Sequence, residues 1–393
     1  MTSSITTTER TFTCSDGVKL VVKSWTSSGA YDSKPSENVT TKKILCLHGW
    51  LDNAASFNRL APLLLNSSPS QAGEKHEQQP VEIFALDFPG HGLSGHKSVD
   101  GPPQLLAEVT YYVLECIEAL EWGTGNGGGG GSGTRTVVGN INANVNTSNS
   151  SQESSGRDDN LSSSSTNSDD RDNKINLIGH SMGAGVSCVL VAAYPELFAS
   201  LTLLEGAGPL ARNAKDCSRH VRAACQRRLK SNKTLFPDGA TVGNKRVKIY
   251  PSIDAAVEAR MQTTQRMPGD QYLSVEAARD MVARATVEVA ATENSGDNRP
   301  VTFRHDPRLQ WPSLQYYTRE QVDAFYSDIC SSNVPVCILM AEDGWPVDSW
   351  SQSAVTDILK PKYTKLLRGS HHFHADPDTV ADVASGIISF LET

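Results

Sequence analysis

The 393-residue chain is about two to three times as long as an average domain, so it holds one large domain with insertions or two modules. Its 36 basic and 44 acidic side chains give a net charge of −8, which excludes nucleic-acid binding through an overall positive field. Hydrophobic residues make up 38% of the chain, but no apolar run approaches the roughly 18 residues of a membrane span. We expect a globular protein with no transmembrane segment and no nucleic-acid partner. Composition leaves its oligomeric state open.

The cysteines and the first residues of the chain indicate in which cellular compartment the protein is expected. The eight cysteines are scattered without any C-x-x-C pair, which favours reduced thiols. Residues 1–12 lack the basic and apolar regions of a secretory signal. We expect a cytoplasmic protein, with import into an organelle as the open alternative.

Short apolar runs alternate with helical patterns along the chain. Most of these runs are largely apolar along their length, which is typical of parallel strands that are covered on both faces. Alternation of such strands with helices predicts an α/β fold with a mostly parallel, doubly wound sheet. The predicted strands are residues 18–25, 44–47, 81–86, 175–178, 201–204, 336–340 and 365–367, and the predicted helices are residues 104–121, 182–194 and 379–391.

Composition divides the chain further. Gly, Ser and Asn dominate residues 123–173, which predicts a disordered insertion, and residues 67–79 read as a polar surface loop. Residues 1–208 and 334–393 are then two parts of one core. Between them, residues 209–333 are predicted to form a mostly helical cap, or lid, inserted before the penultimate strand, with helices at 219–230 and 274–288.

The cap region also carries a concentration of charge. Arg and Lys gather between Arg212 and Lys233. This pattern is typical of a solvated helical face, and the alternative is an anion-attracting mouth above a binding site.

The sequence around Ser181 has the pattern of a nucleophile. Ser181 lies in a G-x-S-x-G motif, with a short apolar strand before it and an apolar helix after it. Gly179 and Gly183 leave room at a turn where a Cβ would collide. We therefore predict that Ser181 is a catalytic nucleophile on a strand–turn–helix elbow.

A serine nucleophile needs a base, an orienting acid and donors for an oxyanion. Three histidines follow the last predicted strand, and we expect His371 to be the base, with His372 as the alternative and His374 nearby. No carboxylate or cysteine accompanies them at metal-ligand spacing, so we expect neither a metal nor a cofactor.

The loops after two other strands complete the expected site. The oxyanion donors should be the backbone N–H groups of Trp50 and Met182. We interpret His48 as a buried histidine that hydrogen-bonds to loop backbone, and Asp87 as a structural residue of the D-x-x-G-x-G-x-S loop.

These segments together resemble a known family. The sequences LCLHGWLDNAASF at residues 45–57 and DFPGHGLS at residues 87–94, with the elbow at Ser181, resemble the serine hydrolase-like proteins of the α/β-hydrolase superfamily. The resemblance covers roughly residues 40–210 and 333–390 and leaves the Gly-rich insertion outside. It implies the α/β-hydrolase fold, a helical cap and an esterase-like serine mechanism.

The acid is where the sequence departs from the commonest pattern. Many α/β-hydrolases place it in a G-x-x-D sequence after the strand at 336–340, but here Gly344 occupies the fourth place and Asp343 is one residue out of register. Glu205 ends the preceding strand, at the other position that the superfamily uses. We favour Glu205, with Asp343 and then Asp348 as alternatives.

The function predicted is a serine hydrolase that cleaves ester-like acyl bonds of a small-molecule substrate through an acyl-Ser181 intermediate. One alternative is a C–C bond hydrolase with the same triad. The other is a catalytically idle hydrolase fold that serves as a binding or scaffold protein. Ser181 argues against epoxide hydrolases and haloalkane dehalogenases, which use an aspartate nucleophile.

Overall fold

The computed structural model describes residues 5–27, 41–66, 80–99, 106–122, 174–236, 248–290 and 299–393. The predicted insertion at 123–173 and the predicted loop at 67–79 lie outside these residues. None of the helices in the described ranges is long and apolar enough to cross a membrane.

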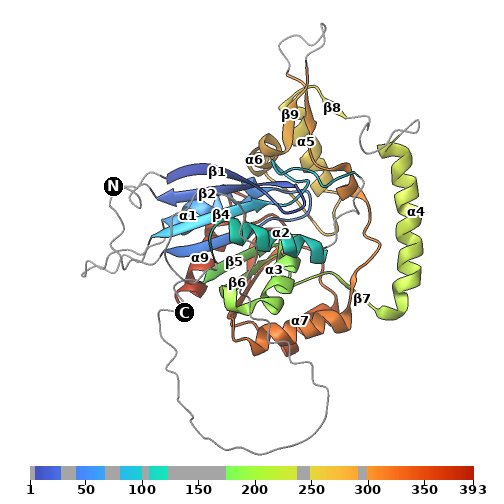
Figure 1. Cartoon of the computed structure of the whole chain (residues 1–393). Helices are drawn as coiled ribbons and strands as arrows, with labels where there is room; N and C mark the ends of the chain where they lie inside the picture. The colour runs from blue at the N-terminus through green and yellow to red at the C-terminus, as the bar shows by residue number, and fades with distance from the viewer. Residues whose placement is uncertain are drawn as a thin grey trace, which may run out of the picture.

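An eight-stranded sheet runs through the molecule in the order β1-β2-β4-β3-β5-β6-β12-β13 (Figure 1). Strand β2 is antiparallel to both of its neighbours, and the pairs from β4 to β13 are parallel. The predicted α/β fold with a mostly parallel sheet is therefore confirmed. The strands are β1 (Ile5–Thr13), β2 (Lys19–Ser27), β3 (Lys42–Leu47), β4 (Val81–Asp87), β5 (Ile175–His180), β6 (Phe198–Leu204), β12 (Val336–Asp343) and β13 (Tyr363–Ser370).

Strand β1 was not predicted from the sequence. It pairs with β2 along all nine residues, yet most of its side chains are exposed. A strand of Thr-rich, exposed residues lacks the apolar run that marks the others, so its backbone hydrogen bonds to β2 define it.

Helices cover both faces of the sheet (Figure 1). One face packs against α2 (Leu106–Ala119), α3 (Met182–Ala193) and α7 (Arg319–Ser331), and the other packs against α1 (Leu60–Leu65) and α9 (Val380–Leu391). The apolar side chains of β3, β4, β5 and β6 alternate between the two clusters. This two-sided burial explains why these strands are continuous apolar runs in the sequence.

The block between β6 and β12 holds both helices and small sheets. Its helix α4 (Cys217–Leu235) contains most of the basic cluster and lies apart from the large sheet, while α5 (Ile253–Thr264) and α6 (Val275–Ala285) lie above one end of that sheet (Figure 1). The last helix, α7, packs against α3 in the core. Short strands complete the block: β7 (Ala211–Arg212), β8 (Ile249–Tyr250), β9 (Thr286–Glu288), β10 (Val301–Phe303) and β11 (Tyr317–Thr318), and α8 (Ser349–Ala354) follows β12.

One predicted helix is too long. Ser274 caps α6 as expected, its Oγ accepting the Ala277 N–H at 3.3 Å, but the helix ends at Ala285 instead of continuing to Glu288. Residues 286–288 form β9, which pairs with β10. The β-branched residues Thr286 and Val287 favour this extended conformation, and backbone pairing with β10, the next strand along the chain, stabilises it.

A buried ion pair joins the block to the large sheet. The Asp87 carboxylate, at the end of β4, is fully buried and accepts the Arg284 Nε–H of α6 at 2.8 Å. It also accepts the backbone N–H groups of Ala54 at 2.7 Å and Leu93 at 2.8 Å. Burial raises the pKa of Asp87 even though Arg284 opposes the rise. Arg284 pairs with Glu9 of β1 as well, so one guanidinium connects three segments.

Replacing Arg284 by methionine tests this connection. Arg284→Met leaves the buried Asp87 carboxylate without its cation, so the free energy of unfolding should fall by about 3 kcal/mol. Arg279→Met on the same helix removes an exposed pair with Asp254, and it should change stability by less than about 1 kcal/mol. Urea unfolding of both variants measures the difference. Equal losses would contradict the role given to the buried pair.

Candidate active site

Ser181 lies on a sharp turn between β5 and α3. Its backbone has φ 53° and ψ −112°, a conformation that non-glycine residues rarely adopt. A Cβ at position 183 would lie 2.1 Å from the Leu47 carbonyl oxygen, and one at position 179 would lie 2.5 Å from Ser187 Oγ. The turn therefore requires glycine on both sides of Ser181, as the G-x-S-x-G pattern predicted.

The turn places Ser181 at the end of the neighbouring strand. The Ser181 N–H donates to the carbonyl of Leu204, the last residue of β6, at 3.0 Å. Met182 is the first residue of α3, so its N–H is one of the groups that a helix leaves without an internal partner. Trp50 lies in the loop after β3, and its indole N–H donates to the Leu309 carbonyl at 2.9 Å. The residues predicted as oxyanion donors thus follow adjacent strands, β3 and β5.

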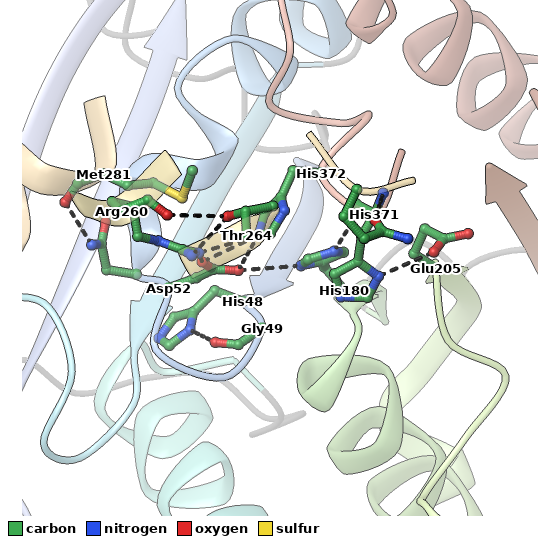
Figure 2. A network of polar contacts seen from close by, with 12 residues as sticks. His48, Gly49, Asp52, His180, Glu205, Arg260, Thr264, Met281, His371 and His372 are labelled. Carbon is green, nitrogen blue, oxygen red and sulfur yellow. Dashed lines mark hydrogen bonds and ion pairs between the residues drawn. The ribbon is translucent and has the colours of Figure 1, made fainter. Parts of the chain in front are cut away.

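Glu205 and His371 form a buried pair. His371 Nδ1 lies 3.0 Å from Glu205 Oε2, and Figure 2 shows the two side chains facing each other. The Glu205 carboxylate also accepts the backbone N–H groups of Ala341 at 2.7 Å and Trp345 at 2.9 Å. Since a carboxylate only accepts, the Nδ1 of His371 carries the proton, and the lone pair of Nε2 remains available.

The position of the Glu205 side chain explains why the sequence lacks a G-x-x-D acid. A Cβ at position 344 would lie 2.3 Å from Glu205 Oε1 and 2.5 Å from Oε2. The carboxylate that extends from β6 therefore occupies the space that a side chain at position 344 would need. An acidic side chain at position 344 would collide with the Glu205 carboxylate. Glu205 in this position therefore requires a glycine at position 344.

The alternative acids make other contacts. The Asp343 side chain is exposed, and the residue contacts the site through its main-chain carbonyl, which accepts the Gln271 side-chain N–H at 2.8 Å. Asp348 caps α8 by accepting the Ser351 N–H at 2.8 Å, and it lies 3.5 Å from Arg319. The geometry therefore pairs His371 with Glu205.

His372, the alternative base, belongs to a second buried network. Its Nε2 lies 3.2 Å from Asp52 Oδ2, and Asp52 Oδ1 accepts Arg260 Nη2 of α5 at 2.5 Å (Figure 2). Burial alone would raise the pKa of Asp52, but His372 and Arg260 outweigh burial and hold that pKa well below its usual value. Asp52 also faces His180 Nδ1 at 3.7 Å, and His180 Nε2 donates to the His371 carbonyl at 2.8 Å.

Sequence reasoning did not find this network. Asp52 stands in the HGWLDN segment, but the sequence gives no sign that its partners lie some 200 and 320 residues further along the chain. Within the described part of the chain, no group of three or more His, Cys, Asp or Glu side chains has the arrangement of a metal site.

Three other histidines are buried. Burial lowers the pKa of His48 to about 3, of His91 to about 4 and of His374 to about 3. His48 contacts loop backbone as predicted, since its Nδ1 lies 2.7 Å from the Gly49 carbonyl and its Nε2 accepts the Phe88 N–H at 3.0 Å. The His374 ring packs against His180 with 4.1 Å between ring centroids and a tilt of 40°, and among the described residues neither of its ring nitrogens has a hydrogen-bond partner.

These histidines predict an acid-sensitive fold. Their pKa values are lower in the folded chain than in the unfolded chain, which binds protons first as pH falls below about 6.5. Each should then reduce the free energy of unfolding by about 1.4 kcal/mol per pH unit down to its folded pKa. His374→Phe removes one such group, so urea unfolding at pH 7, 6 and 5 should show a shallower loss of stability. An unchanged slope would contradict the neutral state of His374.

Comparisons with known proteins agree with this fold and geometry. A family model described as the alpha/beta hydrolase family matches residues 44–383, and the chain belongs to that family. A serine hydrolase-like protein of Dictyostelium discoideum is 24% identical over 92% of this chain and 75% of its own length. A serine hydrolase-like protein of Danio rerio is also 24% identical, over 89% of this chain and 82% of its own length. The resemblance inferred from the sequence is thus confirmed.

A solved structure extends the comparison to the fold. A hypothetical protein of Pseudomonas aeruginosa aligns with 98% of this chain and 99% of its own, with a TM-score of 0.65 and 26% identity. Together with the family match, this likeness confirms the α/β-hydrolase fold.

Proposed function

We propose that the chain is a serine hydrolase that cleaves ester-like acyl bonds of small molecules, with Ser181 as nucleophile, His371 as base and Glu205 as acid. The observation that carries the proposal is the Glu205–His371 contact of 3.0 Å beside the strained turn of Ser181. A serine on such a turn, followed by a helix, is the arrangement that serine hydrolases use to expose the hydroxyl. Membership of the α/β-hydrolase family supports the same chemistry.

In the first step, Ser181 Oγ attacks the carbonyl carbon of the substrate and its proton moves to His371 Nε2. The carbonyl oxygen becomes an oxyanion, which the backbone N–H groups of Trp50 and Met182 would stabilise. The positive imidazolium lies against the Glu205 carboxylate, which has no solvent to screen it. The tetrahedral intermediate then expels the alcohol oxygen, which takes the proton from His371, and leaves an acyl-Ser181.

In the second step, a water molecule gives a proton to His371 and attacks the acyl carbon. Collapse of this intermediate releases the acid and returns the proton to Ser181 Oγ. Neither step needs a cofactor or a metal. The inserted block, residues 209–333, would supply the cap that covers the substrate from its part before α7, since α7 packs in the core.

Removing the nucleophile tests the proposal. Ser181→Ala should lower kcat with p-nitrophenyl esters by several orders of magnitude, on the order of 10⁶, because the covalent route is lost. Esters of increasing acyl length serve as substrates, and circular dichroism checks that the variant folds. Equal turnover by the variant, or no turnover by the wild type with any ester, would contradict ester hydrolysis at Ser181.

The acid is tested by a matched pair of amides. Glu205→Gln keeps the shape but removes the charge opposite the imidazolium, so kcat should fall by at least about 10²-fold. Asp343→Asn changes an exposed carboxylate and should cost less than about tenfold. Both are measured with one ester and corrected for the folded fraction. The reverse ranking would move the acid to the end of β12.

A further inference from the structure

The main chain of His371 is held from two sides. On one side, His180 Nε2 donates to the His371 carbonyl at 2.8 Å. On the other, the His371 N–H donates to the side-chain Oε1 of Gln271 at 2.9 Å. Gln271 belongs to the inserted block, in the stretch between α5 and α6, and only 4% of it is exposed. A residue of the block therefore reaches the backbone of the base.

The other end of the Gln271 amide is also engaged. Its Nε2 donates to the Asp343 carbonyl at 2.8 Å and to the Pro268 carbonyl at 3.1 Å. The next residue, Tyr272, accepts the Ser370 hydroxyl through its carbonyl at 2.7 Å. Two consecutive residues of the block thus bind two consecutive residues at the end of β13.

The Asp343 carbonyl, which accepts the Gln271 amide N–H, lies in the segment that hydrogen-bonds to the Glu205 carboxylate. Ala341 and Trp345 donate their N–H groups to the Glu205 carboxylate, and Asp343 lies between them. Gln271 links this segment to the His371 backbone. Both partners of the Glu205–His371 pair are therefore positioned relative to the same few residues at the end of β12.

We propose that Gln271 is a positioning residue for His371: it fixes the base against the acid, so that the pair is complete only while the inserted block is docked. The inference rests on the proposed function. His371 lies in a turn after β13, so its side chain depends on main-chain hydrogen bonds for its place. A displacement of about 1 Å in such a group can cost about 10²-fold in rate.

The chemistry at position 271 fits an amide best. An amide offers an acceptor to the His371 N–H and donors to two carbonyl oxygens at once. A carboxylate would face the Asp343 and Pro268 carbonyls with like partial charge. A hydrocarbon would leave the buried His371 N–H without its acceptor and would remove the donor from two carbonyl oxygens, at a cost in free energy.

Two variants of Gln271 and one control test the proposal. Gln271→Met keeps the length but removes both hydrogen-bonding functions, and Gln271→Asn shortens the reach of the amide by one methylene. With a p-nitrophenyl ester, kcat should fall by about 10- to 100-fold in the Met variant and by about tenfold in the Asn variant, while KM stays within about twofold. Gln262→Met, at an exposed glutamine of α5 whose amide donates to Glu258 of its own helix, should leave both constants unchanged.

Hydrogen exchange gives a second readout that does not need turnover. The amide of His371 should be protected in the wild type and exchange faster in both Gln271 variants, while the Gln262 variant keeps the protection. If the Met variant folds poorly, exchange of the His371 amide in the milder Asn variant tests the positioning role.

The outcomes separate this inference from the proposed function. An active wild type with unchanged kcat in both Gln271 variants would overturn the positioning role and leave the proposed function standing. A loss confined to KM would also overturn it, because it would indicate a contact with substrate. A wild type without ester turnover, and with Ser181 unreactive, would overturn the proposed function and this inference together.

Discussion

The buried carboxylate of Glu205 is the constraint on which the arrangement of the site depends. Only 2% of Glu205 is exposed, so its charge must be satisfied by the protein. Two backbone N–H groups from the end of β12 and the ring of His371 do this. Because the carboxylate takes the space beside position 344, the same interaction determines which residue can follow β12.

Backbone strain gathers at the ends of the central strands. Leu51 after β3, Ser181 after β5 and Glu205 after β6 have φ of 59°, 53° and 49°. Each such residue costs on the order of 1–3 kcal/mol and persists only where its surroundings determine it. The fully buried parallel strands provide that rigidity. The strained residues and the candidate site therefore lie at the carboxyl ends of the strands, where ligands usually bind in α/β folds.

The sequence predicted the parts of the fold that have a local signal. Strands buried on both faces appear as apolar runs, and the elbow of Ser181 is visible because glycines must flank it. It could not predict β1, whose exposed, Thr-rich residues lack an apolar run, or the end of α6, where hydrogen bonds to β10 define β9.

The sequence likewise predicted some residues of the candidate site and missed others. The sequence predicted His371 as the base and Glu205 as the acid because each follows a predicted strand. The structure favours Glu205 over Asp343 because the Glu205 carboxylate occupies the space beside Gly344. Gln271, Asp52 and Arg260 have no local motif. Their partners are about 70 to 320 residues away along the chain, so only the folded structure brings them to the site.

The proposed function requires Ser181, His371 and Glu205 to act together on an acyl group. A crystal structure of the protein after reaction with a fluorophosphonate tests this most directly, because the phosphorus mimics the tetrahedral carbon. The account predicts a covalent bond from Ser181 Oγ to phosphorus and a phosphonyl oxygen within hydrogen-bond distance of the N–H groups of Trp50 and Met182. It also predicts that the contact between His371 and Glu205 is retained. An unmodified Ser181, or an adduct on another residue, would contradict the account.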